Sequence, residues 1–121
     1  MKLLTQEQIA KMIDNGKFEN REKDHYPVVK LFMPGTGCTW LLVDLDPEYP
    51  HIAYGLCDLG MGFPELGSVD LNELSSVKNR FGLGVERDLY FKAKFPLSVY
   101  ANAARNCEQI TEVYTILSQF S

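Results

Sequence analysis

The sequence predicts an α+β fold, an antiparallel sheet of four to five strands with N-terminal, middle and C-terminal helices packed on it. Two observations predict it. Short runs of alternating or wholly apolar residues, separated by turn-forming Gly, Pro and Asp, indicate strands between residues 28 and 95. Helix-start patterns open segments near residues 5 and 70, and apolar residues recur at helical spacing towards the C-terminus.

Composition indicates one domain and excludes some functions. The 121 residues suit a single domain, with a core over about 1–100 and a helical C-terminal extension over about 98–120. A net charge of −4 gives no overall attraction to nucleic acid or anionic membrane. No apolar run approaches the roughly 20 residues of a membrane span. The N-terminus lacks the features of a signal peptide, so we expect a cytoplasmic protein.

Two capping patterns predict where helices begin. Thr5 caps the first helix, and Gln8 completes a capping box. This helix is expected to run to about Asn15, with Gly16 as a left-handed stop. A second box, Asp70 to Glu73, opens a short helix through residue 77.

Four strands are predicted before residue 70. The segments 28–33 and 38–44 form a hairpin through a Pro-Gly-Thr-Gly turn. The apolar run 40–43 indicates a central strand covered on both sides. A third strand follows over 51–58, with small residues on one face that leave room for a helix. The segment 65–69 is expected to form a short fourth strand.

The segment 85–95 alternates almost perfectly and predicts one long strand. The face expected to be buried would carry, in order, Val85, Arg87, Leu89, Phe91, Ala93 and Phe95. One arginine therefore stands in an apolar row. Because an arginine keeps its charge when buried, it requires a carboxylate or several carbonyl groups.

Glu65 and Glu73 are the candidate partners of Arg87, since both lie on elements expected to pack near this strand. The favoured interpretation is a structural ion pair, with Arg87 largely buried within about 4 Å of an acidic side chain. The alternative is a site for a phosphate or carboxylate ligand.

Glu86 and Asp88 share the solvent-exposed face of the same predicted strand, about 7 Å apart. They could hold one hard cation or act as a general acid and base, joined by Asp44 or Asp58. Lysines continue the same row, which is more typical of a solvated face. The chain carries three cysteines and no CxxC pair, so buried free thiols are expected. We assign no metal, cofactor or catalytic residue.

An apolar stripe near the C-terminus recurs at helical spacing. It packs on this domain's own sheet or forms a helix for a partner or a second copy. Whether one helix or two, broken near residue 106, carry it is left open. Its members are Ile110, Val113, Tyr114, Leu117 and Phe120.

Several motifs in order resemble the family of domain of unknown function 2958. They are Trp40 with Asp44, Tyr54-Gly55-Leu56, Pro64-Glu65-Leu66-Gly67, Leu71 with Glu73-Leu74, and residues 85–91 followed by Pro96-Leu97-Ser98. The resemblance spans about residues 1–100. It implies a bacterial, phage or conjugative-element context and brings no catalytic residues.

The leading functional hypothesis is a non-enzymatic protein-binding accessory or regulatory factor of a phage or other mobile element. Homo-oligomerisation through the C-terminal helix is also considered. The alternative is a small enzyme or anionic-ligand-binding domain that uses Arg87 with the nearby carboxylates Glu86 and Asp88. An enzyme should show a pocket in which several of five residues converge, namely Arg87, Glu65, Glu73, Asp58 and Trp40. The third is weak nucleic-acid binding by a small basic and aromatic patch made by Lys78, Arg80, Tyr90, Lys92 and Lys94.

Overall fold

The computed structural model describes residues 3–121. Its helices are α1 (Gln6–Gly16), α2 (Leu71–Ser76), α3 (Leu97–Cys107), α4 (Tyr114–Leu117) and a final 3-10 turn η1 (Ser118–Phe120). Its strands are β1 (Val29–Phe32), β2 (Cys38–Leu45), β3 (Ile52–Leu59), β4 (Glu65–Asp70) and β5 (Glu86–Arg87).

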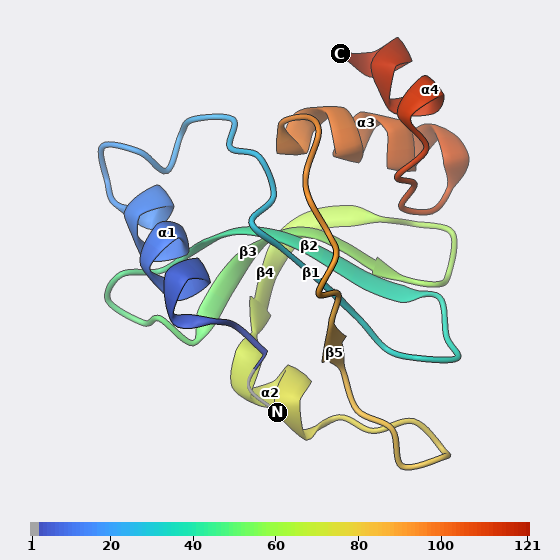
Figure 1. The fold of residues 1–121 in the computed structure, drawn as a ribbon, viewed down its shortest axis with the longest axis horizontal. Coiled ribbons are helices and arrows are strands. Elements are labelled where there is room, and N and C mark those ends of the chain that lie inside the picture. The colour runs from blue at the N-terminus through green and yellow to red at the C-terminus, as the bar shows by residue number, and fades with distance from the viewer. Residues whose placement is uncertain (1–2) are drawn as a thin grey trace.

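The five strands form one antiparallel sheet in the order β4-β3-β2-β1-β5 (Figure 1). Helix α3 lies on one side of the sheet and α2 on the other, with α1 at one end. The predicted α+β class, the antiparallel sheet and the three helical regions are therefore confirmed. No helix in the described part of the chain has the length and apolar character of a membrane span.

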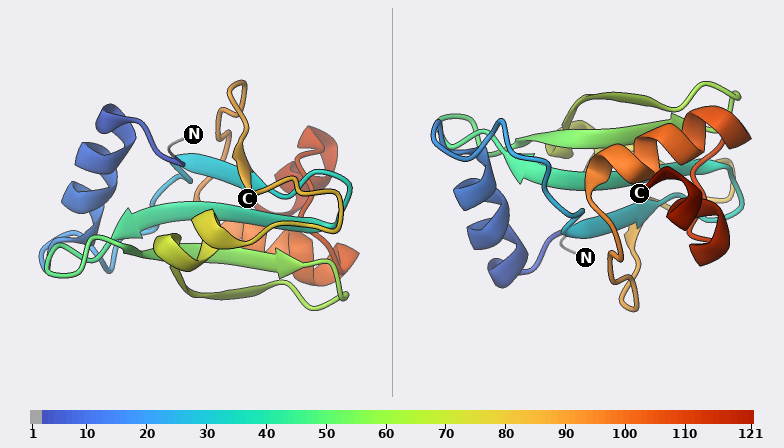
Figure 2. Two further views of the ribbon diagram at one scale, coloured as in Figure 1. Left: turned by 90° about the horizontal axis from the view of Figure 1, so that it is seen from below. Right: turned by 90° about the horizontal axis from the view of Figure 1, so that it is seen from above.

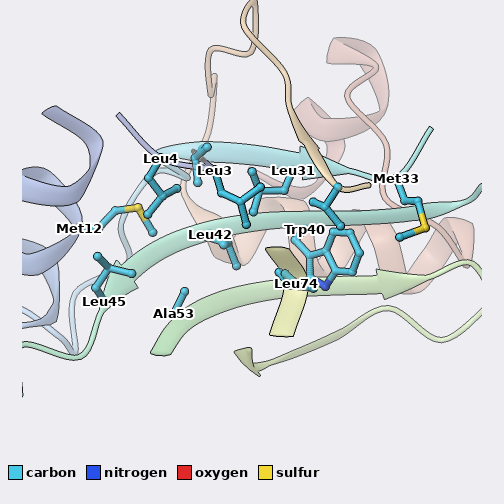
Figure 3. Packing of buried hydrophobic residues seen from close by; sticks show 12 residues of the cluster. Leu3, Leu4, Met12, Leu31, Met33, Trp40, Leu42, Leu45, Ala53 and Leu74 are labelled. Atoms are coloured by element: carbon cyan, nitrogen blue, oxygen red, sulfur yellow. The ribbon is translucent and has the colours of Figure 1, made fainter. Parts of the chain in front are cut away.

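The sheet separates two hydrophobic clusters, and β2 contributes to both. On one side, Trp40 and Leu42 pack with Met12 of α1, Leu74 of α2 and the N-terminal Leu4 (Figure 3). The other side is covered by α3, which crosses the strands with the C-terminal segment beside it (Figure 2). There the buried β2 residues are Leu41 and Val43. This explains why residues 40–43 are all apolar, and it confirms the predicted central strand.

Helix α1 begins as predicted but ends for a different reason. Thr5 and Gln8 form the reciprocal capping box, with bonds of 2.9 and 3.1 Å. Gly16, however, is the last helical residue and has no positive φ, so the predicted left-handed stop is wrong. A Cβ at Gly16 would lie 1.9 Å from the carbonyl oxygen of Leu45. Glycine is needed because the helix end touches the backbone of β2.

The predicted long strand over 85–95 is wrong in extent, because only Glu86 and Arg87 pair with β1. The carboxylate of Asp88 accepts a bond from the backbone N–H of Tyr90 at 2.9 Å, which bends the chain in an Asx turn. Beyond the turn the chain leaves the sheet. The apolar row is consequently split between the two clusters. Val85 belongs to the α1 side, Phe91, Ala93 and Phe95 pack on the α3 side, and Leu89 is exposed.

Two helical segments form the C-terminal region. Helix α3 ends at Cys107, and Glu108 adopts a left-handed conformation with φ of 60°. Residues 108–113 are irregular, and the short α4 and η1 follow. Of the two arrangements that the sequence left open, the broken one is observed.

Candidate functional site

Arg87 and Glu65 lie in one row across the sheet, but at its two opposite edges. Arg87 is aligned with Leu31, and the row continues through Trp40 and Cys57 to Glu65. Four strand spacings of about 4.8 Å separate them by roughly 19 Å. The structure therefore does not bring this expected pair within ion-pair distance.

Arg87 itself is half-buried rather than largely buried, at the short outer strand β5. Glu73, its other expected partner, is exposed on α2. Arg87 lines none of the three surface hollows described below. The structure thus does not gather Arg87, Glu65 and Glu73 around one hollow.

Asp88 contacts a lysine, and Glu86 is exposed. The Nζ of Lys30 on β1 lies 3.6 Å from an Asp88 carboxylate oxygen and also contacts the carboxylate of Glu112. Through these two contacts the lysine, whose side chain is only 18% exposed, connects β1 to the turn after β5 and to the C-terminal segment. Within residues 3–121, no three or more His, Cys, Asp or Glu side chains gather as metal ligands.

Asp58 ties the end of β3 to the C-terminal segment. Its side chain is almost fully buried, and the residue is 3% exposed. One carboxylate oxygen accepts a bond from the backbone N–H of Gly60 at 2.8 Å, and the other from that of Ile110 at 2.9 Å. From the sequence, Asp58 was a candidate for a cation site, for acid–base chemistry and for an enzyme pocket, but not for this structural role. Its acidic character at a strand end was visible, but its partner lies 52 residues away in the chain.

The C-terminal stripe packs largely on its own domain. Leu117 is 1% exposed in the cluster beneath α3, and Ile110 and Phe120 pack against it. Tyr114 contacts the ring of Phe95, with centroids 5.4 Å apart, although it remains exposed like Val113. The packed residues are therefore not available as a continuous helix face.

A polar hollow of about 360 Å³ lies at the end of the sheet next to α1. Asp44, Tyr54 and Ser68 are aligned across three strands and line it, together with Asp46, Arg21 and Glu22 from loops. A shift of register in β2 immediately before Asp44 positions this row. The buried Asn15 satisfies the carbonyl of Val43 there, with a bond of 2.8 Å.

Asp44 has an altered acidity in this hollow. Burial raises the pKa of its carboxyl group, and the neighbouring Asp46 also raises it. The electrostatic interaction with His25 opposes this rise. None of the five residues expected to converge in an enzyme pocket lines this hollow.

A second hollow, of about 460 Å³, lies beside β4 and is mainly apolar. It is lined by Phe63, Pro64 and Leu66, with Glu65 and Arg105. Phe63 is 79% exposed and Leu66 41% exposed. A third hollow, of about 610 Å³, lies between the first residues of the described chain, α1 and α2.

Strand β4 forms the longer of the two outer edges of the sheet. Within residues 3–121 its only partner is β3, along six aligned residue pairs without a register shift. It contains no Pro or Lys, the residues with which proteins commonly protect such edges. The other edge, β5, has only two residues. An incoming strand would therefore find β4 the more favourable edge.

Comparison with known proteins yields one match. The model of a family described as "Protein of unknown function (DUF2958)" matches residues 3–111, which includes all of α3. The match therefore extends beyond residues 1–100, over which the sequence motifs resemble the family. No curated protein and no solved structure matches the chain.

Proposed function

Because the chain belongs to the DUF2958 family, whose description assigns no activity, we propose a function from its own surface. We propose that it is a non-enzymatic protein-binding module that captures an extended segment of another protein along the outer edge of β4. The observation that carries this proposal is the unprotected six-residue edge beside an apolar hollow.

Strand addition explains how such an edge binds. The outward N–H and C=O groups of β4 would form main-chain hydrogen bonds with the added segment. Neighbouring apolar side chains would supply the hydrophobic contribution. Phe63 and Leu66, which line the hollow and are exposed, are the side chains available for this purpose.

We further propose that this module acts in the cytoplasm as an accessory or regulatory factor of a phage or other mobile element. The resemblance of the sequence motifs to the family supports this context. The net charge of −4 favours a protein partner over nucleic acid. An anionic-ligand or enzymatic role is less well supported, because Arg87 and Glu65 lie at opposite edges of the sheet.

The proposal can be tested by selecting peptides that bind the full chain and finding where on the chain they bind. Peptides selected from a displayed random library against the full chain should slow amide hydrogen exchange in β4. The variant Ser68→Lys should weaken them, because a lysine projecting from an edge strand disfavours strand addition. Gln119→Lys, an equal change of charge at an exposed residue of η1, should leave binding unchanged.

Two results would refute the proposal. One is a selected set of peptides that protects another surface and leaves β4 unprotected. The other is equal binding by Ser68→Lys and Gln119→Lys.

A further inference from the structure

The outer edge of β4 carries its residue types in mirror order. From Glu65 to Asp70 the order is acidic, apolar, small, small, apolar, acidic. Within residues 3–121 neither terminal acid forms an ion pair. An occupant that pairs with the whole strand therefore meets one unneutralised carboxylate at each end.

Building on the proposed function, we infer that the occupant is an extended segment of another protein with the pattern basic–apolar–x–x–apolar–basic. Residues directly opposite each other on neighbouring strands interact, and opposite charges are favourable there. The partner's two basic residues would face Glu65 and Asp70. Because the order of residue types in β4 is a mirror image of itself, the pattern is the same for parallel and antiparallel addition.

The faces of the strand distinguish the two apolar positions of the partner. Leu66 is aligned with Leu56, which is buried on the α3 side, and it borders the hollow with Phe63. Val69 is aligned with Ala53, which is buried on the α1 side. One apolar side chain of the partner therefore packs beside the 460 Å³ hollow, and the other packs on the opposite face beside Val69.

The charge of the chain disfavours a second copy as the occupant. Each copy carries a net charge of −4, so two copies repel each other. The edge thus favours a basic partner.

Three synthetic peptides with blocked ends test the pattern. Their central sequences are Lys-Val-Thr-Thr-Ile-Lys, Gln-Val-Thr-Thr-Ile-Gln and Glu-Val-Thr-Thr-Ile-Glu. At low salt the basic peptide should bind the full chain about tenfold more tightly than the neutral one, and the acidic one should bind most weakly. The difference should shrink in about 0.5 M NaCl, because salt screens exposed charges. Amide exchange should report protection of β4.

The matched protein variant is Glu65→Gln with Asp70→Asn. Asp70 caps α2 by accepting the backbone N–H of Asn72 at 2.8 Å, and asparagine is an equally good cap. The double variant should therefore remain folded and bind the basic and neutral peptides equally. Equal affinities of the native chain for all three peptides, with β4 protected, would overturn the charge pattern alone. Absence of β4 protection by any peptide would overturn strand addition as well.

Discussion

Replacing Asp58 tests how the C-terminal segment is held. Asp58→Ala would leave the backbone N–H groups of Gly60 and Ile110 without the carboxylate that each now contacts. A hydrogen bond to a charged group contributes about 1.5–3 kcal/mol when buried. Gly60 is exposed, so water can replace that bond, whereas Ile110 is half-buried. We expect a loss of about 2–3 kcal/mol in the free energy of unfolding.

Urea unfolding measures this loss, and amide exchange locates it, with the Ile110 N–H expected to exchange faster. Asp46→Ala is the matched control. The carboxylate of Asp46 also accepts two backbone N–H groups, those of Glu48 and Tyr49, but in an exposed loop. Its loss should be under about 1 kcal/mol, because water replaces the bonds. Equal losses for the two variants would refute the role of burial in this reasoning.

Three further predictions concern other contacts. Gly16→Ala should lower the free energy of unfolding, measured in urea, by about 2 kcal/mol, because the new Cβ would lie 1.9 Å from the carbonyl oxygen of Leu45. A higher free energy of unfolding, which is the usual result of Gly→Ala in a helix, would contradict this reasoning. Burial raises the pKa of Cys57 from 9.0 to about 11, so the folded state retains its proton more strongly than the unfolded state. Its contribution to stability should be complete below pH 9 and fall as the pH rises towards 11, a decline that Cys57→Ala should reduce in pH-dependent unfolding. Lys30→Met should remove the tie to Glu112 and speed proteolysis of residues 108–121, with a smaller difference from the native chain in 1 M NaCl than in dilute buffer.

Local sequence patterns predicted most of the fold because they depend on neighbouring residues. The capping box at Thr5 and the apolar run of β2 are defined within a few positions, and both are confirmed. The segment 85–95 was different. Its alternating pattern indicated which residues are buried, but not which of the two hydrophobic clusters buries each of them. Val85 and Phe91 are both apolar, yet they pack on opposite sides of the sheet. The turn at Asp88, which divides them, depends on one side-chain bond.

The candidate site was less predictable because it depends on strand order. The motif Pro64-Glu65-Leu66-Gly67 was recognised as part of the family resemblance, but nothing within it indicates whether its strand lies at the centre or the edge of a sheet. The expectation that Glu65 would meet Arg87 required the two strands to be near neighbours. The observed order places β4 and β5 at opposite edges.

That order gives the acidic residues of β4 their significance. On a central strand, Glu65 and Asp70 would each lie between residues of two neighbouring strands of the same chain. At the edge they face solvent, and they are available to basic residues of an added strand. The backbone of the same edge is open to main-chain hydrogen bonding. Selection of a basic partner therefore follows from two carboxylates of ordinary chemistry and from the position of their strand at the edge of the sheet.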